Sequence, residues 1–244
     1  MLSNRVKRRR RVISMPIVRV GRPSLTDYPG ELSAKLVVPG CNLRCPYCVK
    51  GDLIRWNDRR LISEKEILQH IYRVKGYLTG IVFGGGEPTL HNGLLQFLYK
   101  VRSVGYKIRI DTNGTNPRRL NKLMEERVID YISLDVKAPF ERYPEVVASK
   151  VNLDAVRQSV KLLRRGGVDY DFTTTAVPGL LDGDDLEEIA KTLIGSKRFV
   201  IKQHRPGRML DRAYEKVNPF SAEELKGFQR RIAPYFAECN VKLI

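Results

Sequence analysis

The sequence predicts an α/β fold built around a parallel sheet, and three observations support this prediction. Six short β-rich apolar runs alternate with amphipathic segments along the 244 residues, which is the pattern of βαβ units. The sharpest motifs directly follow these runs, where parallel folds collect functional groups. Six units fall short of the eight of a closed barrel. Periodicity alone therefore leaves open a curved, incomplete (β/α)6 barrel and an open doubly wound sheet.

The predicted strands cover residues 32–38, 80–83, 107–111, 131–135, 170–175 and 199–203. Between them we expect helices beginning at a capping box formed by Ser63 and Glu66, and then over residues 94–104, 118–126, 153–165 and 186–194. A second capping box, Ser221 with Glu224, starts a last helix expected to run to about residue 238. That helix would carry Cys239 as a buried small side chain. Residues 240–244 would add a short strand or pack against the fold.

Length and composition favour a single domain over residues 23–244, preceded by a basic arm at residues 1–22. We expect the arm to be disordered and to make weak electrostatic contacts. No apolar run reaches the length of a membrane span. The segment after the first basic residues contains Pro16 and Arg19, so it lacks the apolar core of a signal peptide. Four cysteines, three of them grouped, favour a reducing cytoplasm over a disulfide framework.

The formal net charge of +17 is high. Such a charge produces a field that attracts nucleic acid or an acidic protein partner. A platform for stacking single-stranded bases requires aromatic residues between the basic ones. The basic runs of this chain have no such interleaved aromatic residues. For the body of the protein we therefore favour solvated Lys and Arg faces over a nucleic-acid site.

Three cysteines fall within eight residues, in the spacing C-x3-C-x2-C: Cys41, Cys45 and Cys48. Three thiolates this close can hold three corners of a cubane iron–sulfur cluster and leave one iron open to a small ligand. Zinc sites normally close with four ligands, and no histidine lies within twenty residues of Cys48. A zinc knuckle or a group of reduced structural thiols is thus the weaker alternative. Tyr47 offers an aromatic body that could pack against a bound nucleoside.

A glycine-rich motif follows the second predicted strand. Gly84, Gly85 and Gly86 would let the backbone approach a ligand without obstruction by Cβ atoms. Glu87 adds an acceptor suited to an ammonium group, although a glycine turn with a solvent-facing glutamate is the plain alternative. The phosphate-loop ending Gly-Lys-Ser/Thr is missing.

Two aspartates each end an apolar strand, where an unpartnered carboxylate is costly. Asp111 ends the third predicted strand and Asp135 the fourth. They could share a cation, or Asp135 could form a structural salt bridge with Lys137. The sequence Asp111-Thr112-Asn113-Gly114 is by itself also typical of a turn or a helix cap.

Taken together, the motifs resemble those of the radical S-adenosylmethionine (SAM) superfamily. The resemblance is most specific for activating proteins of glycyl-radical enzymes, of the type that activates anaerobic ribonucleoside-triphosphate reductase. It spans roughly residues 24–207, and its motifs occur in the family order at residues 24–30, 38–48, 85–90, 111–114, 135–139 and 177–179.

The resemblance implies an incomplete (β/α)6 radical SAM barrel and an oxidoreductase mechanism. Cys41, Cys45 and Cys48 would ligate a [4Fe-4S] cluster whose open iron chelates SAM. Reductive cleavage would give methionine and a 5′-deoxyadenosyl radical, which would take hydrogen from a glycine of a partner enzyme. The implied partners are a glycyl-radical enzyme of the anaerobic ribonucleotide reductase type and a reduced flavodoxin- or ferredoxin-type electron donor.

The family's cofactor contacts carry over to specific positions of this chain. The methionine end of SAM would lie against the glycine-rich motif, and a site for SAM and a monovalent cation would form at the two aspartates. The implied cofactor-binding residues are Tyr47, Gly85, Gly86, Glu87, Asp111, Thr112, Asp135 and Lys137.

The chain departs from the family pattern in three places. Val49 and Lys50 stand where many members have His-Asn, Thr173 replaces an arginine, and His204 lies where this subgroup often carries an aromatic residue. His204 would face the cofactor or be an ordinary packed histidine. These changes keep open an alternative, a radical SAM enzyme that modifies a small molecule or a nucleic-acid base.

Overall fold

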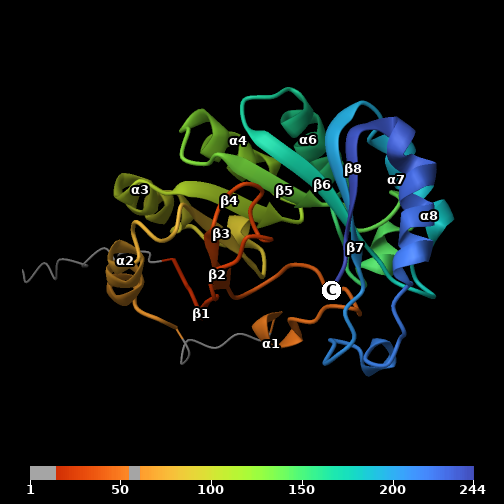
Figure 1. Cartoon of the computed structure of the whole chain (residues 1–244), viewed down its shortest axis with the longest axis horizontal. Coiled ribbons are helices and arrows are strands. Elements are labelled where there is room, and N and C mark those ends of the chain that lie inside the picture. The colour runs from red at the N-terminus through yellow and green to blue at the C-terminus, as the bar shows by residue number, and fades with distance from the viewer. Residues whose placement is uncertain (1–14, 55–60) are drawn as a thin grey trace, which may run out of the picture.

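The strands of this protein follow one another across a single curved sheet in the same order as along the chain. The computed structural model describes residues 15–54 and 61–244, and within them the sheet has eight strands in the order β1 to β8. All neighbours from β2 to β8 pair in parallel, while β1 pairs antiparallel to β2 at one edge. Helices cover the outer face of the curve (Figure 1). The parallel α/β sheet, curved and not closed, confirms the predicted fold class.

Each predicted strand is present with small shifts at its ends. The strands are β1 (Arg19–Val20), β2 (Ser33–Val38), β3 (Gly80–Gly85), β4 (Lys107–Thr112), β5 (Tyr131–Asp135), β6 (Asp169–Ala176), β7 (Ser196–Gln203) and β8 (Phe236–Lys242). The α-helices are α1 (Gly51–Ile54), α2 (Glu64–Arg73), α3 (Leu94–Val104), α4 (Pro117–Glu125), α5 (Tyr143–Val146), α6 (Leu153–Arg164), α7 (Gly183–Thr192) and α8 (Ala222–Ile232). Three short 3-10 turns complete the described elements, at Pro88–Leu90, Arg212–Tyr214 and Ala233–Tyr235.

The end of the last helix was predicted wrongly. The capping box at Ser221 and Glu224 is present, but α8 stops at Ile232 and a 3-10 turn containing Pro234 follows. Proline has no N–H to donate and its ring obstructs the preceding turn, so it stops a helix. The chain then forms β8, which pairs in parallel with β7. Cys239 consequently lies on a strand, partly buried, and not in a helix.

The beginning of the described chain packs onto the sheet. Met15 and Ile17 are buried, Ile17 bridges to Ile62, and Arg19–Val20 forms β1. These residues had been assigned to the basic arm; the rest of that arm, residues 1–14, lies outside the described residues.

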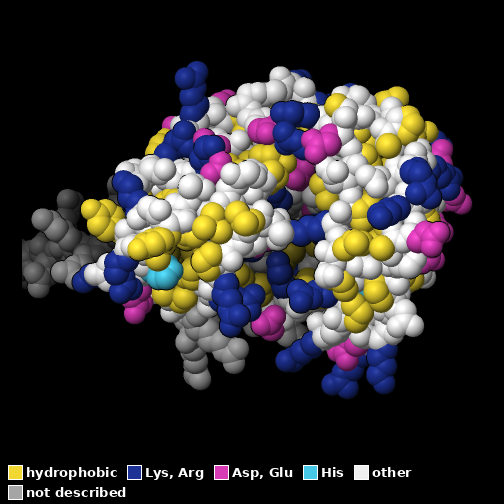
Figure 2. All heavy atoms as spheres, in the orientation of Figure 1, with side chains coloured by type: hydrophobic (Ala, Val, Ile, Leu, Met, Phe, Trp, Pro, Cys, Tyr) yellow, Lys and Arg dark blue, Asp and Glu magenta, His cyan; other side chains and the backbone are white. Residues whose placement is uncertain are grey.

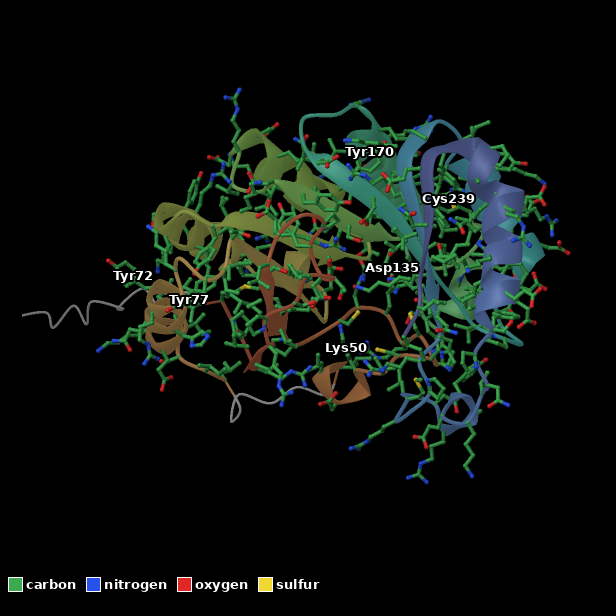
Figure 3. The ribbon with its side chains drawn as sticks, viewed as in Figure 1. Lys50, Tyr72, Tyr77, Asp135, Tyr170 and Cys239 are labelled. Carbon is green, nitrogen blue, oxygen red and sulfur yellow. The ribbon has the colours of Figure 1, made fainter. Side chains whose placement is uncertain are left out.

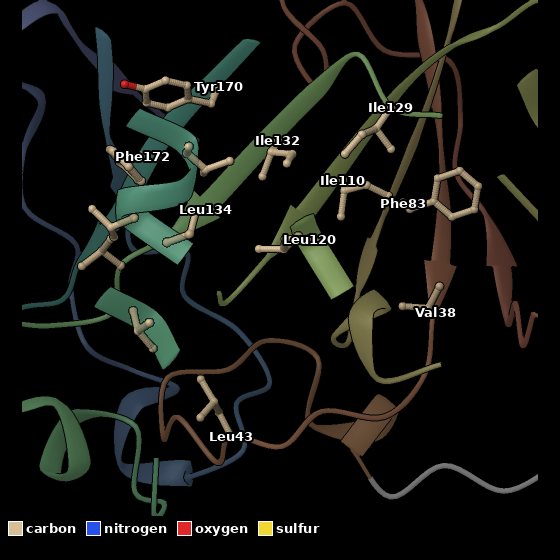
Figure 4. Close-up of a cluster of buried hydrophobic side chains, with 14 of the residues drawn as sticks. Val38, Leu43, Phe83, Ile110, Leu120, Ile129, Ile132, Leu134, Tyr170 and Phe172 are labelled. Carbon is tan, nitrogen blue, oxygen red and sulfur yellow. The ribbon is translucent and has the colours of Figure 1, made fainter. Parts of the chain in front are cut away.

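Alternation along the strands separates an apolar layer from a polar one, because successive side chains of a strand point to opposite faces. Ile110, Ile132, Leu134 and Phe172 point outward into the core beneath the helices, where Leu120 of α4 meets them (Figure 4). Their neighbours in sequence face the concave side and are mostly polar. The sheet therefore has a dry outer layer and a charged interior.

A small cluster of buried side chains lies on the concave face of the sheet. Tyr28, Val82 and Tyr131 pack together there, with the two tyrosine rings 5.6 Å apart. The guanidinium of Arg109 stacks over the Tyr131 ring at 5.0 Å. In the described part of the chain no helix has the length and apolarity to cross a bilayer.

Candidate active site

A cavity of about 490 Å³ lies at the carboxyl ends of the parallel strands and extends into the concave interior. It brings together every predicted site residue: Cys41, Cys45, Tyr47, Cys48, Gly85, Gly86, Glu87, Asp111, Thr112, Asp135 and Lys137. A larger hollow of about 710 Å³ lies on the outer surface between α2 and α3, and none of these residues lines it. Parallel folds carry their chemistry at the strand ends, so the first cavity is the candidate active site.

The three cysteines lie on the loop that leaves β2. All are free thiols; Cys45 is buried, and Cys41 and Cys48 are half-buried at the cavity wall. A tight turn, Cys48 N–H to Cys45 C=O at 3.0 Å, brings the last two together. The Leu43 N–H points at the Cys41 sulfur at 3.5 Å, and the Asn113 side-chain amide lies 3.9 Å from it. Such donors favour a thiolate over a thiol.

The glycine-rich motif lies directly against the cysteine loop. Gly86 N–H donates to Val38 C=O at 2.8 Å, and Glu87 N–H donates to Gly40 C=O at 2.7 Å. A Cβ on Gly86 would stand 2.0 Å from the Gly40 carbonyl oxygen. The sequence predicted that a glycine allows close approach by a ligand; in the structure, the chain segment that comes this close to Gly86 is the cysteine loop.

Glu87, in the loop after β3, forms hydrogen bonds that connect this loop to the end of β4 and the loop after it. Its side chain is 1% exposed, and both carboxylate oxygens accept hydrogen bonds. Thr89 N–H (3.0 Å), Thr89 O–H (2.6 Å) and Thr112 O–H (2.8 Å) donate to Oε1, and Asn113 N–H (2.7 Å) donates to Oε2. Burial raises the pKa of Glu87, and these four donors oppose the rise. Glu87 is therefore not solvent-facing, which rules out the alternative of a glycine turn with an exposed glutamate.

Each of the two strand-end aspartates is paired with two cationic side chains. Asp111 accepts from Lys35 at 2.8 Å and from Arg109 at 2.8 Å, and these charges hold its pKa far below the usual range despite burial. Asp135 accepts through Oδ2 from Lys137 at 2.7 Å, the predicted pair.

Asp135 has a second cationic partner, Lys202, whose ammonium lies 2.8 Å from the same Oδ2 atom. An additional monovalent cation near the two aspartates would meet four positive side chains. The residues present do not fit such a cation.

Three buried polar atoms at the cavity have no hydrogen-bond partner among the described residues. They are the Tyr47 hydroxyl, Asp135 Oδ1 and the Thr173 hydroxyl. Asp135 and Thr173 are register partners on β5 and β6, so their free atoms lie on adjacent strands. Buried polar atoms are nearly always hydrogen-bonded. Their presence here indicates that the cavity is shaped to receive a polar ligand.

The positions that depart from the family pattern also lie at the cavity. His204 is 1% exposed, and its Nε2 atom is 3.4 Å from the Tyr214 carbonyl oxygen, so it is both packed and a lining residue. Lys50 lines the cavity as well, and burial together with Lys35 and Lys202 lowers its pKa to about 8. Figure 3 shows Lys50 and Asp135 in the middle of the molecule, between the strand ends and α1.

Comparisons with known proteins agree with this geometry. The family model of the radical SAM superfamily matches residues 36–193. A Methanocaldococcus jannaschii protein, named provisionally as a glycyl-radical enzyme activating enzyme, is 30% identical over 226 residues, covering 91% of this chain and 93% of its own length.

The chain belongs to the radical SAM superfamily. It is also 30% identical, over 116 residues, to the 7-carboxy-7-deazaguanine synthase of Aquifex aeolicus, covering 47% of this chain and 51% of that protein. Among solved structures, SuiB from Streptococcus suis bound to S-adenosylmethionine has a similar fold, with a TM-score of 0.66 at 17% identity. The match covers 86% of this chain and half of SuiB.

Membership of the radical SAM superfamily implies a [4Fe-4S] cluster and SAM, and the residues present fit both. Among residues 15–54 and 61–244, no three His, Cys, Asp or Glu side chains are placed to hold a metal ion. The cysteines share a wall without converging on one point, whereas a cubane offers each thiolate a separate iron. The unpartnered atoms of Tyr47, Asp135 and Thr173 suit the polar groups of SAM.

Loading the cluster into this radical SAM site would release protons. Burial raises the pKa of Cys41, and it raises the pKa of Cys45 to about 11. Both groups are therefore thiols at neutral pH in the metal-free protein, and iron binds thiolates.

The paired charges of this radical SAM site give a testable stability effect. Replacing Asp111 by asparagine leaves Lys35 and Arg109 without their shared counter-charge and should lower the free energy of unfolding by about 2 kcal/mol. Because its folded pKa is depressed, the stabilisation is present above the ordinary aspartate pKa and is lost as pH falls through the lowered one. Urea titrations at several pH values measure it.

The matched control is Asp154→Asn on α6. Its side chain is 80% exposed, and its one salt bridge among the described residues is to Arg157 on the helix surface, so we expect a change of at most about 0.5 kcal/mol. Equal effects of the two substitutions at pH 7 would contradict the role given to Asp111.

Proposed function

We propose that the protein cleaves SAM reductively and installs a glycyl radical on a partner enzyme of the anaerobic ribonucleotide reductase type. The observation that carries the proposal is the arrangement of one cavity: three free thiols on its wall and three unpartnered polar atoms beside them. The choice of a protein glycine as substrate is supported by the relative from M. jannaschii, which is similar over nearly its whole length.

The residues divide into cluster ligands and SAM contacts. Cys41, Cys45 and Cys48 would hold the [4Fe-4S] cluster, which when bound supplies one electron to the sulfonium of SAM. Asn113 donates toward the Cys41 sulfur and so favours its thiolate form. The Tyr47 hydroxyl is free to bond the nucleoside end.

The amino-acid end of SAM carries both an ammonium and a carboxylate, and the strand ends offer partners for each. Asp135 Oδ1 would accept from the ammonium, while Lys137 and the Thr173 hydroxyl would donate to the carboxylate. Gly85 and Gly86 also line the cavity, where their lack of side chains lets the segment after β2 pack directly against them. Polar recognition of both ends would orient the sulfonium toward the cluster.

The buried cluster of Tyr28, Val82 and Tyr131 and the apolar layer behind the strands would limit the access of water through the sheet. A carbon radical abstracts hydrogen from many groups, so exclusion of other donors protects the reaction. The glycine-bearing segment of the partner would enter at the strand ends, and a reduced flavodoxin- or ferredoxin-type protein would supply electrons. The free cysteines suit a reducing compartment such as the cytoplasm.

A second candidate is modification of a small molecule or a nucleic-acid base. It is favoured by the similarity to a 7-carboxy-7-deazaguanine synthase, whose name describes action on a base-like compound. That similarity covers about half of each chain, so we rank this function below the first.

An anaerobic assay tests the proposal. Protein reconstituted with iron and sulfide is mixed with SAM and dithionite, and 5′-deoxyadenosine is measured; a glycyl-radical enzyme is then added and the radical is followed by electron paramagnetic resonance. We expect 5′-deoxyadenosine and a glycyl signal that disappears when the target glycine of the partner is replaced by alanine. Nucleoside formation without any protein radical would favour the second candidate, and absence of both would refute SAM cleavage.

A further inference from the structure

The cavity has more positive than negative side chains on its walls. Figure 2 shows Lys and Arg side chains gathered around the hollow in the middle of the molecule. Five lining residues are carboxylates: Asp27, Glu87, Asp111, Asp135 and Asp171. Seven are cationic: Lys35, Lys50, Arg109, Lys137, Lys202, Arg205 and Lys242.

Most of these cations are paired. Asp111 pairs with Lys35 and Arg109, and Asp135 pairs with Lys137 and Lys202.

At the mouth of the cavity, Lys242 donates to the Thr26 carbonyl at 2.8 Å and lies 3.8 Å from Asp27. Lys50 differs from these lysines. In the part of the chain that the structure describes, it lies within 4 Å of no carboxylate. It is partly buried and lines the same cavity as Lys35 and Lys202.

The backbone of Lys50 is held in place. Its carbonyl accepts from Leu53 N–H at 2.9 Å, and Leu53 C=O in turn accepts from Gly40 N–H at 2.8 Å. The next residue, Gly51, packs against Leu210 so closely that a Cβ there would lie 3.2 Å from the Leu210 Cα. The backbone that carries Lys50 is thus fixed, so binding an anion would have to order only the side chain itself.

The cofactors of the proposed function would not remove this positive excess. A [4Fe-4S] core of charge 2+ with three thiolates carries one negative charge. SAM carries one net positive charge from its sulfonium, ammonium and carboxylate. The two cancel in this resting state, so the loaded cavity keeps an excess of two positive charges. Reduction of the core to 1+ adds one negative charge and leaves an excess of one.

We propose that Lys35, Lys50, Lys202 and Lys242, which we call the basic wall, bind a carboxylate or phosphate group of the substrate, with Lys50 as the principal contact. This inference rests on SAM cleavage as proposed above, and it adds the charge class of the substrate for either candidate, a protein glycine or a small molecule. The anionic group would come from an acidic side chain next to the target glycine or from a small phosphorylated molecule. In either case the basic wall aligns the reacting atom beside the SAM site.

Isothermal titration calorimetry on the reconstituted, SAM-loaded protein tests the inference with two probes. One is inorganic pyrophosphate; the other is the capped peptide Ala-Asp-Gly-Ala, compared with its Asn analogue. We expect at least one probe to bind, pyrophosphate if the source is a phosphate and the Asp peptide if it is a side chain. Lys50→Met should weaken that probe about tenfold, as loss of one charge-assisted contact does.

Two further variants sharpen the test. Lys50→Arg keeps the charge and should restore most of the affinity, whereas Lys161→Met, on the exposed face of α6, should bind as the unaltered protein does. Absence of binding by both probes, or equal binding by Lys50→Met, would overturn the inference. Iron content and SAM binding of the same preparations are measured separately. A preparation that binds SAM but neither probe refutes this inference alone, while one without iron refutes the proposed function.

Discussion

Replacing Cys45 by alanine is expected to abolish both the iron–sulfur absorption of the reconstituted protein and its formation of 5′-deoxyadenosine. Cys45 is the most buried of the three loop cysteines, at 7% exposure, and lies on the cavity wall. A cubane held by two thiolates would expose two irons to solvent and lose the single open position that SAM requires. Iron analysis, visible absorption and nucleoside quantification under anaerobic conditions measure the effect.

Cys239→Ala is the matched control. This thiol is partly buried like Cys41 and Cys48, and burial raises its pKa to about 11, as it does for Cys45, but it lies on β8 and does not line the cavity. Figure 3 places Cys239 on the strand beside α8, away from Lys50 and Asp135. The control should keep its iron and its activity. Undiminished 5′-deoxyadenosine from Cys45→Ala would contradict the ligand assignment.

Replacing Gly86 by alanine should have the second-largest effect. The cause of this effect would be steric overlap. The added methyl group would lie 2.0 Å from the Gly40 carbonyl oxygen and 3.0 Å from the Pro39 carbonyl carbon, so the cysteine loop must move. Because both neighbours are backbone atoms, no side-chain rotation relieves the overlap. We expect the free energy of unfolding to fall by about 3 kcal/mol and iron uptake to fall with it. Urea denaturation and iron content after reconstitution are the measurements.

Gly227→Ala is a control for which we expect a change in the free energy of unfolding of the opposite sign. Gly227 lies within α8, where the nearest atom to an added Cβ is an Arg230 nitrogen 3.9 Å away. Alanine favours a helix over glycine by about 1 kcal/mol, so this variant should be slightly more stable and load iron normally. A Gly86→Ala protein as stable as the unaltered one would show that the two loops can separate without cost.

The sequence was most informative about groups that lie at strand ends. The cysteine loop, the glycine-rich motif and Asp135 were all predicted, because a short motif after an apolar strand can be placed without knowing how the strands pair. The salt bridge of Asp135 with Lys137, one of two alternatives that the sequence left open, could be foreseen because the two residues lie two positions apart in sequence.

The partners inside the strands could not be predicted in this way. Lys35, Arg109 and Lys202 are isolated charges in apolar runs, and their roles depend on register. Lys202 reaches Asp135 from β7 across β6. A signal was available, because a charged residue at alternate positions of an otherwise buried strand indicates that one face is polar. Which aspartate each of these cations pairs with depends on the tertiary structure.

For the last strand, a local sequence pattern led to a wrong prediction. A good capping box and amphipathic pattern at residues 221–232 favoured extending the helix, but local propensity is a weak prior where tertiary pairing competes. Pro234 stops the helix, and β7 offers an unpaired edge that residues 236–242 fill in parallel.

The backbone bonds between the cysteine loop and the glycine-rich motif have a consequence for a protein exposed to air. They join Val38 and Gly40 to Gly86 and Glu87 without using any sulfur atom. If oxygen destroys the inorganic centre, these two hydrogen bonds would still join the two segments. Repair by fresh iron, sulfide and reductant would then begin from segments that are already in contact.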